Sequence, residues 1–346
     1  MKAVVVSRFG GPENLQLVVD FPDPVPGPGE ALVRVRACAL NHLDIWVREG
    51  IPSYKIKLPH VLGCDVAGEI AALGQGVTAF KIGERVVVSP GRSCGDCDAC
   101  LSGRDNDCPR YGIIGAQGGQ GGYAQLLAAP ERCLLPMPSS LSFEQAAAYP
   151  LTFLTAWHML MTLGGIGPDQ FVLIQGAGSG IGVAAIQLCR LAGAKSIAVS
   201  TSAEKLEKAK ALGADMTIHN DGRSENVVRE TMKLTGGRMA DVVFEHVGTA
   251  TLDASLRSLR PSGKVVICGS TTGPTAEIDL RYVFSRQLQL VGSKMGTQEE
   301  LRRVTRLVAE GRLKPVVDKV FPLANARAAH EHLAAKKQFG KVVLAA

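Results

Sequence analysis

The sequence predicts an α/β protein of two domains, in which a β-rich part precedes a doubly wound parallel sheet. Short strands separated by Gly and Pro turns fill about the first 140 residues, which is the pattern of an antiparallel β domain. From Phe171 onward, short apolar runs alternate with helical stretches, as in a parallel sheet covered by helices on both faces. The length of 346 residues suits about two domains.

The first part of the chain is expected to form a distorted β barrel. Strands are predicted at 4–6, 31–37, 66–73 and 85–89, each bounded by turn residues. Proline recurs at every second position over 22–28, so this segment is expected to be an extended connector and not a helix.

The second part shows the strand–helix alternation element by element. Strands are expected at 171–175, 195–200, 216–219, 242–245 and 265–268, and helices at 180–192, 204–212 and 225–234. The tail returns to mixed elements, with helices at 299–310 and 324–337 and strands at 316–321 and 341–344. These short buried-type strands favour a parallel sheet.

Composition argues for a small-molecule ligand and against nucleic acid or membrane partners. The net charge of +6 comes from scattered residues, and aromatic residues make up only 5% of the chain. The apolar run 146–167 contains Pro150, His158 and several glycines, so a buried helix is expected there and not a membrane span. No secretory signal is visible, and a cytoplasmic protein is expected.

A glycine-rich turn lies where a strand is expected to lead into a helix. It comprises Gly176, Ala177, Gly178, Ser179, Gly180, Ile181 and Gly182. Glycines let a pyrophosphate approach the backbone, and the helix N-terminus supplies free N–H groups. Ile181 stands where the strict dinucleotide-binding pattern has its third glycine, but the strand-to-helix context still predicts a dinucleotide site. The alternative is a packing turn.

The end of the second strand of this part bears on cofactor preference. A carboxylate there would bind the ribose 2′-hydroxyl of NAD, but the sequence has Ser200, Thr201 and Ser202, with Lys205 following. Small hydroxyls and a lysine suit a 2′-phosphate, so NADP(H) is preferred over NAD(H). Alternatively, Lys205 is an ordinary solvated helix residue.

Four of the nine cysteines crowd together and predict a structural metal site. Cys94, Cys97, Cys100 and Cys108 have the spacing C-x2-C-x2-C-x7-C. Four thiolates leave no open position, so one closed structural Zn²⁺ per subunit is expected. An iron–sulfur cluster is the rival, because Pro109 follows the last cysteine as in ferredoxins. Cys38, Cys133, Cys189 and Cys268 are expected to be core residues.

Several motifs resemble the medium-chain dehydrogenase/reductase superfamily over essentially the whole chain. They are residues 41–44 (NHLD), 63–69 (GCDVAGE), the four-cysteine segment, 150–156 (PLTFLTA) and the glycine turn. The resemblance implies a GroES-like catalytic domain, formed by both chain ends, around a central Rossmann domain. It suggests domain bounds of 1–149 (with a zinc lobe at 91–110), 150–295 and 296–346.

The resemblance also implies that the catalytic zinc of some relatives is absent. Its ligand positions match Asn41, the pair Cys64–Asp65 and Leu151, and Asn and Leu are poor zinc ligands. Leu43 stands where the alcohol proton relay begins with Ser or Thr. The pattern is similar to the quinone oxidoreductase-like branch. Cys64 is interpreted as a small buried residue, with a remnant metal ligand as the alternative.

Other functional residues follow from the same resemblance. It places Asn41 and Thr155 near the nicotinamide as candidates for catalysis, with His42 and Asp44 as neighbours in the same segment. His42 is a candidate hydrogen-bond donor to the acceptor or the ribose, with a structural histidine as the alternative. Tyr54, in an expected substrate-side loop, is a candidate acid. The candidates for the nicotinamide side are Val247, Gly269, Ser270, Phe339, Gly340 and Lys341. Asn220 stands near the adenosine, where the branch often has a tyrosine.

The sequence therefore predicts hydride transfer from NADPH to a quinone, an enone or another activated carbonyl compound without catalytic zinc. A zinc-dependent alcohol dehydrogenase and a non-catalytic NADPH-binding protein are the alternatives. A homodimer or homotetramer is expected, with 264–268 and 288–291 as strands that could be sheet edges and pair between subunits.

Overall fold

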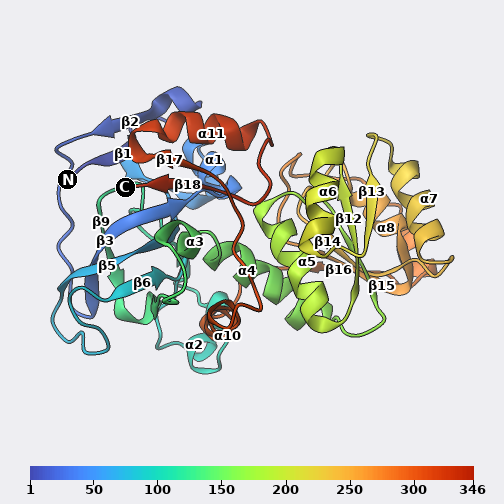
Figure 1. Ribbon diagram of the computed structural model, residues 1–346, viewed down its shortest axis with the longest axis horizontal. Coiled ribbons are helices and arrows are strands. Elements are labelled where there is room, and N and C mark those ends of the chain that lie inside the picture. Colours follow the sequence, from blue (N-terminus) through green and yellow to red (C-terminus); the bar gives the residue numbers. More distant parts are fainter. The chain divides into compact units, whose positions relative to one another are not determined.

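A computed structural model describes residues 1–346 (Figure 1). The chain divides into two units by its contacts. Unit 1 comprises residues 1–151 and 297–346, and unit 2 comprises residues 152–296. The sequence analysis had placed the two breaks at 149 and 295. Unit 1 is thus built from both ends of the chain.

Unit 2 is a doubly wound parallel sheet, as predicted. Its strands are β11 (Phe171–Ile174), β12 (Lys195–Ser200), β13 (Met216–His219), β14 (Ala240–Glu245), β15 (Leu259–Ile267) and β16 (Gln289–Gly292). They lie in the order β13-β12-β11-β14-β15-β16, and every neighbouring pair is parallel. The strand order reverses between β11 and β14, and in such sheets ligands bind at the carboxyl ends of the strands at this point.

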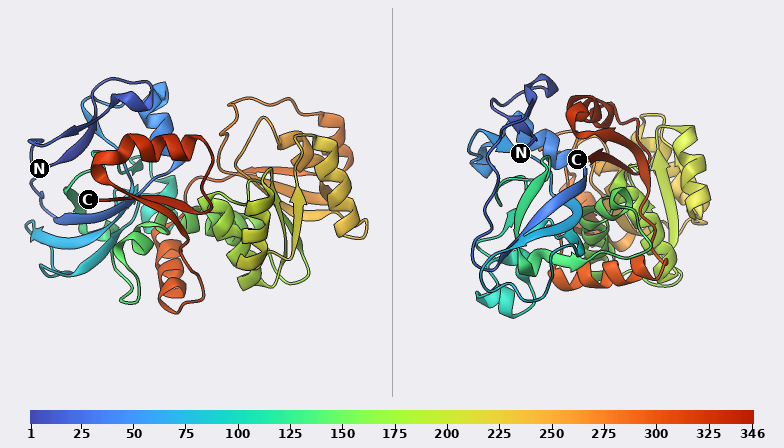
Figure 2. Two further views of the ribbon diagram at one scale, coloured as in Figure 1. Left: turned by 45° about the horizontal axis from the view of Figure 1, so that its top comes forward. Right: turned by 60° about the vertical axis from the view of Figure 1, so that its left-hand side comes forward.

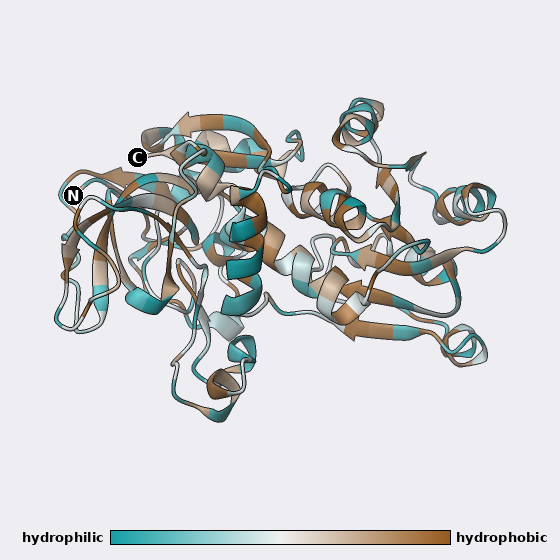
Figure 3. Cartoon of the chain, turned by 60° about the horizontal axis from the view of Figure 1, so that its bottom comes forward, coloured by the Kyte–Doolittle hydropathy of each residue, from teal (hydrophilic) through white to brown (hydrophobic).

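Helices cover this sheet because each crossover between parallel strands returns through one. They are α5 (Gly180–Ala192), α6 (Ala203–Leu212), α7 (Ser224–Leu234), α8 (Leu252–Arg257) and the short α9 (Leu280–Ser285). Helices α5 and α6 pack on β12, and α7 packs on α8. Figure 3 shows the strands of this sheet largely in the brown of hydrophobic residues. The apolar side chains of strands, α7 and α8 form a buried core that fixes the sheet.

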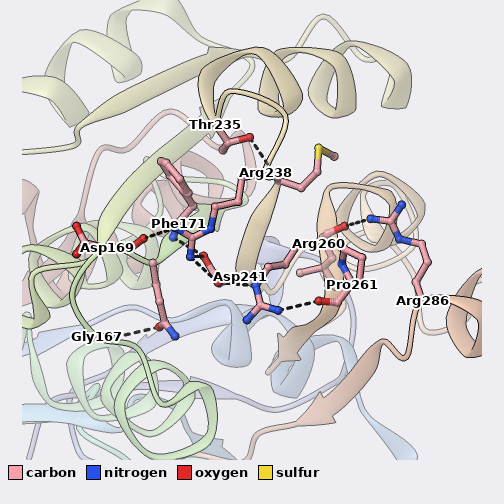
Figure 4. A network of polar contacts seen from close by, with 12 residues as sticks. Gly167, Asp169, Phe171, Thr235, Arg238, Asp241, Arg260, Pro261 and Arg286 are labelled. Atoms are coloured by element: carbon pink, nitrogen blue, oxygen red, sulfur yellow. Dashed lines mark hydrogen bonds and ion pairs between the residues drawn. The ribbon is translucent and has the colours of Figure 1, made fainter.

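A polar network holds the amino ends of β11 and β14 together (Figure 4). The buried Asp241 carboxylate accepts a hydrogen bond from the Phe171 backbone N–H at 2.8 Å and from Arg260 Nε at 2.6 Å. Arg238 donates to the same carboxylate and to the carbonyl of Asp169 at 3.0 Å. This network stabilises the end of the sheet opposite to the glycine turn.

Unit 1 contains a mainly antiparallel sheet of seven strands. Its path runs β10 (Leu134–Pro136), β6 (Arg85–Val88), β5 (Asp65–Leu73), β3 (Glu30–Ala39), β18 (Lys341–Ala345) and β17 (Val317–Pro322), with β9 (Leu126–Pro130) also paired to β3. No strand pair joins β10 to β17, so the expected distorted barrel is not closed by a ladder. Strand β18 pairs antiparallel with β3, and this brings the chain's last residues beside its first domain.

Unit 1 also contains further strands and five helices, of which α10 is the longest. The strands are β1 (Ala3–Val6), β2 (Leu15–Val18), β4 (His60–Val61), β7 (Gly91–Arg92) and β8 (Gly112–Ile113). The helices are α1 (His42–Glu49), α2 (Asp98–Leu101), α3 (Phe143–Ala147), α10 (Gln298–Ala309) and α11 (Ala326–Ala334). Helix α11 packs along β18, and both views in Figure 2 show the two side by side. Residues 22–28 contain no helix, as the prolines predict.

The apolar run at 146–167 forms helical elements of its own. After α3 come α4 (Pro150–Trp157) and a π-helical turn at His158–Gly164. No helix of the chain is both long and apolar enough to cross a membrane.

One strand expected at a sheet edge is in the interior. The segment 264–268 belongs to β15, which pairs with β14 on one side and β16 on the other. Its backbone groups are therefore already paired, and the expectation that it lies at an edge was wrong. The segment 288–291 overlaps β16, which is the last strand of the sheet and does lie at an edge.

Candidate functional site

The glycine turn links β11 to α5 in the context that dinucleotide binding requires. Gly176 has φ +59°, a left-handed conformation that favours glycine. Ser179 caps α5, because its Oγ accepts the backbone N–H of Gly182 at 3.0 Å. A Cβ at Gly178 would lie 2.7 Å from Cδ of Lys205, so the lysine stem lies across the turn. The structure thus brings Lys205 to the glycine turn, and its role toward the 2′-phosphate of a cofactor stays a prediction.

His246 lies directly beneath this turn, and the sequence analysis missed it. Its Nε2 is 2.9 Å from the carbonyl oxygen of Gln175 and 3.2 Å from Oγ of Ser179. A Cβ at Gly176 would lie 3.0 Å from the imidazole ring. Burial lowers the pKa of His246, so the ring is neutral at pH 7 and Nε2–H donates to the Gln175 carbonyl. The imidazole therefore supports the turn from below.

Glu245, the last residue of β14, organises the neighbouring loop. One carboxylate oxygen accepts the backbone N–H groups of Val247 at 2.7 Å and Gly248 at 3.1 Å. The other carboxylate oxygen accepts hydrogen bonds from the hydroxyls of Thr251 at 2.9 Å and Ser255 at 2.6 Å. Glu245 is fully buried. A buried charge with four donors fixes the loop that carries Val247 at the carboxyl end of the sheet.

The turns after β14 and β15 lie against each other. A Cβ at Gly248 would lie 2.8 Å from Cα of Ser270, and one at Gly269 would lie 3.1 Å from the carbonyl oxygen of His246. Val247, Gly269 and Ser270 are thus gathered at the carboxyl ends of adjacent strands. The structure brings these predicted residues together in unit 2, and their role toward a cofactor stays a prediction.

The end of β12 presents the residues expected to read the ribose. Ser200 Oγ accepts the backbone N–H of Ser202 at 3.2 Å, and Ser202 Oγ accepts that of Lys205 at 3.4 Å. Thr201, between them, is exposed. The Asn220 backbone N–H donates to the Ser200 carbonyl at 2.8 Å, so the end of β13 lies beside this turn. These contacts build a hydroxyl-lined turn that contains no carboxylate.

Three further candidates have different surroundings. Thr155 in α4 is 5% exposed, and its Oγ1 has no hydrogen-bond partner in the chain. An unpartnered buried hydroxyl carries a free-energy cost, which a bound ligand would relieve. His42 opens α1 and stacks edge-to-face on Trp46, with 4.9 Å between ring centroids. Tyr54 ends a short 3₁₀ turn, Pro52–Tyr54, and partial burial raises the pKa of its phenol.

A buried polar cluster in unit 1 contains Asn41, Asp65 and Lys341. The Lys341 ammonium lies 2.6 Å from Oδ1 of Asn41 and 2.9 Å from Oδ2 of Asp65. Nδ2 of Asn41 donates to the same Asp65 oxygen at 2.8 Å and approaches Sγ of Cys64 at 3.5 Å. The other Asp65 oxygen accepts the backbone N–H of Leu151 at 2.8 Å. The four positions that the resemblance matched to metal ligands thus meet here, together with Lys341 from the group expected at the nicotinamide.

This cluster does not suit a catalytic metal ion. Leu151 has an apolar side chain, and it contacts Asp65 through its backbone N–H, which is a donor and not a metal ligand. Burial and the nearby carboxylates raise the pKa of Cys64 well above its usual range, which keeps the thiol protonated. The positive charge that a metal would supply is already present on Lys341. The sequence had identified Asn41 and Lys341 separately but gave no sign that they touch.

Asp44 joins the two segments that carry this cluster. Its carboxylate accepts the backbone N–H of Asn41 at 2.7 Å and that of Gly63 at 3.1 Å. Burial raises its pKa to about 6. Tyr123 hydrogen-bonds to Asp44, and its hydroxyl is 3.1 Å from Nε2 of His330. Asp44 is therefore a positioning residue in this structure, and the resemblance had placed it only as a catalytic candidate.

The segment expected to close over the cofactor is part of unit 1. Phe339 is buried, and its backbone N–H donates to Oδ1 of Asp318 at 3.0 Å. Gly340 has φ +97°, and a Cβ there would lie 2.4 Å from the carbonyl oxygen of Val316. The turn before β18 therefore needs glycine. Contact of Phe339, Gly340 and Lys341 with a cofactor stays a prediction.

The four predicted metal-binding cysteines converge around one point. Their sulfur atoms all lie within 4.8 Å of one another, and three pairs are 3.4–3.7 Å apart. Those separations match the edges of a tetrahedron with Zn–S bonds of about 2.3 Å. Backbone N–H groups of Gly95 and Arg110 point at Cys100 and Cys108 from 3.4 and 3.3 Å. Cys94, Cys97, Cys100 and Cys108 therefore fit one closed structural zinc site.

Unit 2 likewise fits a dinucleotide. The glycine turn has no room for larger residues. A Cβ at Gly182, for example, would lie 2.7 Å from the Gly176 carbonyl oxygen. The turn opens a helix of 13 residues at the point where the strand order reverses. The pyrophosphate of a nicotinamide cofactor would bind at Gly178–Gly180.

Comparison with known proteins agrees with these features. Residues 27–139 match the alcohol dehydrogenase GroES-like domain, and residues 180–310 match the zinc-binding dehydrogenase family. The chain is 34% identical to an alcohol dehydrogenase of Geobacillus stearothermophilus over 99% of both chains. It is 30% identical to a quinone oxidoreductase of Homo sapiens, over 96% of this chain and 94% of that one.

A crystal structure of an NAD-dependent alcohol dehydrogenase superposes with a TM-score of 0.96, at 47% identity and over the full length of both chains. The relatives have different names but are all oxidoreductases. The likeness covers the residues of both units. The chain therefore belongs to the medium-chain dehydrogenase/reductase superfamily, and it is an NAD(P)H-dependent oxidoreductase.

Proposed function

We propose that this enzyme transfers a hydride from NADPH to a quinone, an enone or another activated carbonyl compound without a catalytic metal ion. The observation that carries this proposal is the cluster of Asn41, Asp65 and Lys341. An amide, a carboxylate and an ammonium already satisfy one another at 2.6–2.9 Å. Zinc-dependent alcohol oxidation needs a metal ion with an open coordination position. The cluster of Asn41, Asp65 and Lys341 provides no site for such an ion.

The chain's own residues would do three things in this reaction. The glycine turn and the N-terminus of α5 bind the pyrophosphate. The loops fixed by Glu245 and His246 hold Val247 and the Gly269–Ser270 turn beside the ring. Thr155, whose buried hydroxyl has no partner in the chain, provides the hydrogen bond that polarises the acceptor oxygen, and Asn41 holds Lys341 and Asp65 in place within unit 1. The nicotinamide, when bound, supplies the hydride.

NADPH is the proposed reductant because of the turn after β12. Ser200, Thr201 and Ser202 present hydroxyls and backbone N–H groups, and Lys205 adds a positive charge nearby. A carboxylate that would repel a 2′-phosphate is absent from these positions. The solved structure named as an NAD-dependent alcohol dehydrogenase argues instead for NADH. The dissociation constants of NADPH and NADH, measured by nicotinamide fluorescence, decide between them.

A direct screen tests the reaction. The purified protein is assayed with NADPH and with NADH against 1,4-benzoquinone, 2-cyclohexenone and benzaldehyde. The rate is measured as the loss of absorbance of the reduced nicotinamide. We expect turnover with the quinone or the enone, and no loss of rate with a chelator that leaves the cysteine site filled. Turnover only with the aldehyde would contradict the proposal.

Alcohol–aldehyde interconversion is the second candidate. It is favoured by the 47% identity to a structure named as an NAD-dependent alcohol dehydrogenase. It requires alcohol oxidation with NAD⁺ that a metal chelator abolishes. The same purified protein, assayed with benzyl alcohol and 2-propanol before and after chelation, separates the two candidates.

We further propose a cytoplasmic homodimer or homotetramer. All nine cysteines are unpaired, as expected in a reducing compartment. Strand β16 is an edge with exposed backbone groups, and Leu290 is 48% exposed on it. Leu280 and Phe284 of α9 are each 71% exposed close by in sequence. An exposed apolar edge invites pairing with a second copy. Light scattering during size-exclusion chromatography would measure the mass.

A further inference from the structure

Four buried side chains form a closed ring of polar contacts inside unit 1. Asp44 and Arg48 lie four residues apart on α1, and Tyr123 and His330 bridge them. The Tyr123 hydroxyl is hydrogen-bonded to the Asp44 carboxylate and is 3.1 Å from Nε2 of His330. Nη1 of Arg48 is 3.2 Å from Nδ1 of the same imidazole. None of the four residues is more than 3% exposed, so solvent does not compete for these contacts.

The guanidinium of Arg48 sets the direction of every hydrogen bond in this ring. A guanidinium can only donate, so Nδ1 of His330 accepts and the proton of the neutral imidazole is on Nε2. Nε2–H therefore donates to the Tyr123 oxygen, and the Tyr123 hydroxyl donates to the Asp44 carboxylate. Burial and the Arg48 charge lower the pKa of His330 to about 3, which keeps the imidazole neutral at pH 7, as this pattern requires.

We propose that His330 and Tyr123 are positioning residues for Asp44, and that they act through this directed chain of hydrogen bonds. The Asp44 carboxylate accepts the backbone N–H of Asn41 at 2.7 Å and that of Gly63 at 3.1 Å. The Tyr123 hydroxyl is its third donor, and a bond to an ionised acceptor is stronger than a neutral one. The three donors together fix the rotation of the carboxylate. The chain thereby joins the start of α1, where Asn41 lies, to the segment that leads into β5.

Further contacts hold the guanidinium and the imidazole in place. Nε of Arg48 donates to the Gly10 carbonyl at 2.9 Å, and Nη2 donates to Glu49 at 2.6 Å. His330 lies in α11, which packs against α1 and β18. Its imidazole also packs edge-to-face on the Tyr123 ring, with 5.7 Å between centroids. The imidazole therefore cannot turn without breaking contacts on both of its sides, and the fold keeps the direction of the chain.

The tautomer of His330 tests the direction of the chain. The full-length protein is labelled with ¹⁵N-histidine, and its nitrogen resonances are recorded at pH 7. The signals of His330 are those that are missing from the variant His330→Gln. We expect a protonated Nε2 and an unprotonated Nδ1, because Arg48 donates to Nδ1. A proton on Nδ1 would overturn the proposal, since the Tyr123 hydroxyl would then turn toward the imidazole.

Three variants separate hydrogen bonding from packing. Tyr123→Phe removes only the hydroxyl, His330→Leu removes both ring nitrogens, and His330→Gln keeps one acceptor and one donor. Hydrogen exchange of peptides that cover 41–44 and 61–64 is measured by mass spectrometry. We expect exchange to be at least about tenfold faster in Tyr123→Phe and His330→Leu, and close to wild type in His330→Gln. The matched control is His332→Gln, on the same helix but paired with Asp318, and it should leave exchange in both peptides unchanged.

Two results of the exchange measurement would refute the positioning role. One is unchanged exchange in folded Tyr123→Phe. The other is exchange in His330→Gln as fast as in His330→Leu, which would reduce the imidazole to a packing residue. If His330→Leu does not fold, Tyr123→Phe and His330→Gln decide the question, since exchange in the glutamine variant is then compared with that in Tyr123→Phe.

The consequence for turnover rests on the proposed function. With an acceptor from the screen, Tyr123→Phe should lower kcat severalfold and leave the KM for NADPH unchanged, because the ring lies in unit 1 and the glycine turn in unit 2. An unchanged kcat together with faster exchange would contradict a role in the reaction. If the wild-type protein reduces no acceptor, the proposed function fails, and the tautomer and the exchange rates still decide whether His330 and Tyr123 position Asp44.

Discussion

Replacing Glu245 by glutamine should destabilise unit 2 by about 2–4 kcal/mol, since it removes a buried charge that accepts four hydrogen bonds. The two backbone N–H groups cannot turn, so the glutamine oxygen must stay toward Val247 and Gly248. Its amide nitrogen then faces Thr251 and Ser255, whose hydroxyls can rotate to accept. Each bond to a charged acceptor is worth about 1 kcal/mol more than a neutral one, and all four lose that difference.

The matched control is the same substitution at the protein surface. Glu225 lies in α7 of the same unit, and its side chain is 73% exposed in an ion pair with Arg257. Glu225→Gln should therefore cost less than about 1 kcal/mol.

The assay must report unit 2 alone, because a chain with two units need not unfold in one step. Of the two tryptophans, Trp157 belongs to unit 2 and Trp46 to unit 1. In a Trp46→Phe background, tryptophan fluorescence during urea unfolding follows unit 2. The reasoning is refuted if Glu245→Gln and Glu225→Gln change the free energy of unfolding by the same amount.

Three further predictions concern metal, pH and cofactor. Cys108→Ser should lose the bound zinc while Cys189→Ala, which alters a buried helix residue, keeps it; metal content by mass spectrometry checks this. The pKa of Asp44 is raised from 3.8 to about 6, so its protonation stabilises the fold below pH 4 and this contribution of about 3 kcal/mol is lost as pH rises through 6. The stability of wild type relative to Asp44→Asn should therefore fall between pH 4 and pH 7 in urea titrations, and a constant difference would rule out the buried charge as the cause. Lys205→Ala should weaken NADPH about tenfold and leave NADH nearly unchanged; equal losses for both would assign the lysine to the shared pyrophosphate instead.

The sequence predicted the elements of unit 2 well because each has a local signal. Helix α5 begins at Gly180 and ends at Ala192, as predicted, and in the structure Ser179 caps its start and Gly193 follows its end. The four-cysteine site was equally readable, since its ligands lie within fifteen positions of one another.

Contacts between distant residues were not readable. Nothing near Lys341 indicates that its ammonium reaches Asn41, which is 300 positions away. The support of the glycine turn by His246 depends on how β14 packs beside β11, which no local pattern encodes. Lys341 begins a strand whose other side chains are mostly buried. A charged residue at such a position is a weak signal that it has a buried polar partner.

The position of strand β18 has a consequence for synthesis on the ribosome. The chain is made from its N-terminus, yet β3 receives its β18 neighbour only from residues 341–345. Residues 152–296 complete their own sheet earlier and can fold as soon as they emerge. The domain translated first is therefore completed after unit 2, and the edge of β3 at 37–39 stays open until residues 341–345 are made. A chain that stops a few residues short would leave that edge exposed and would be marked for aggregation or degradation.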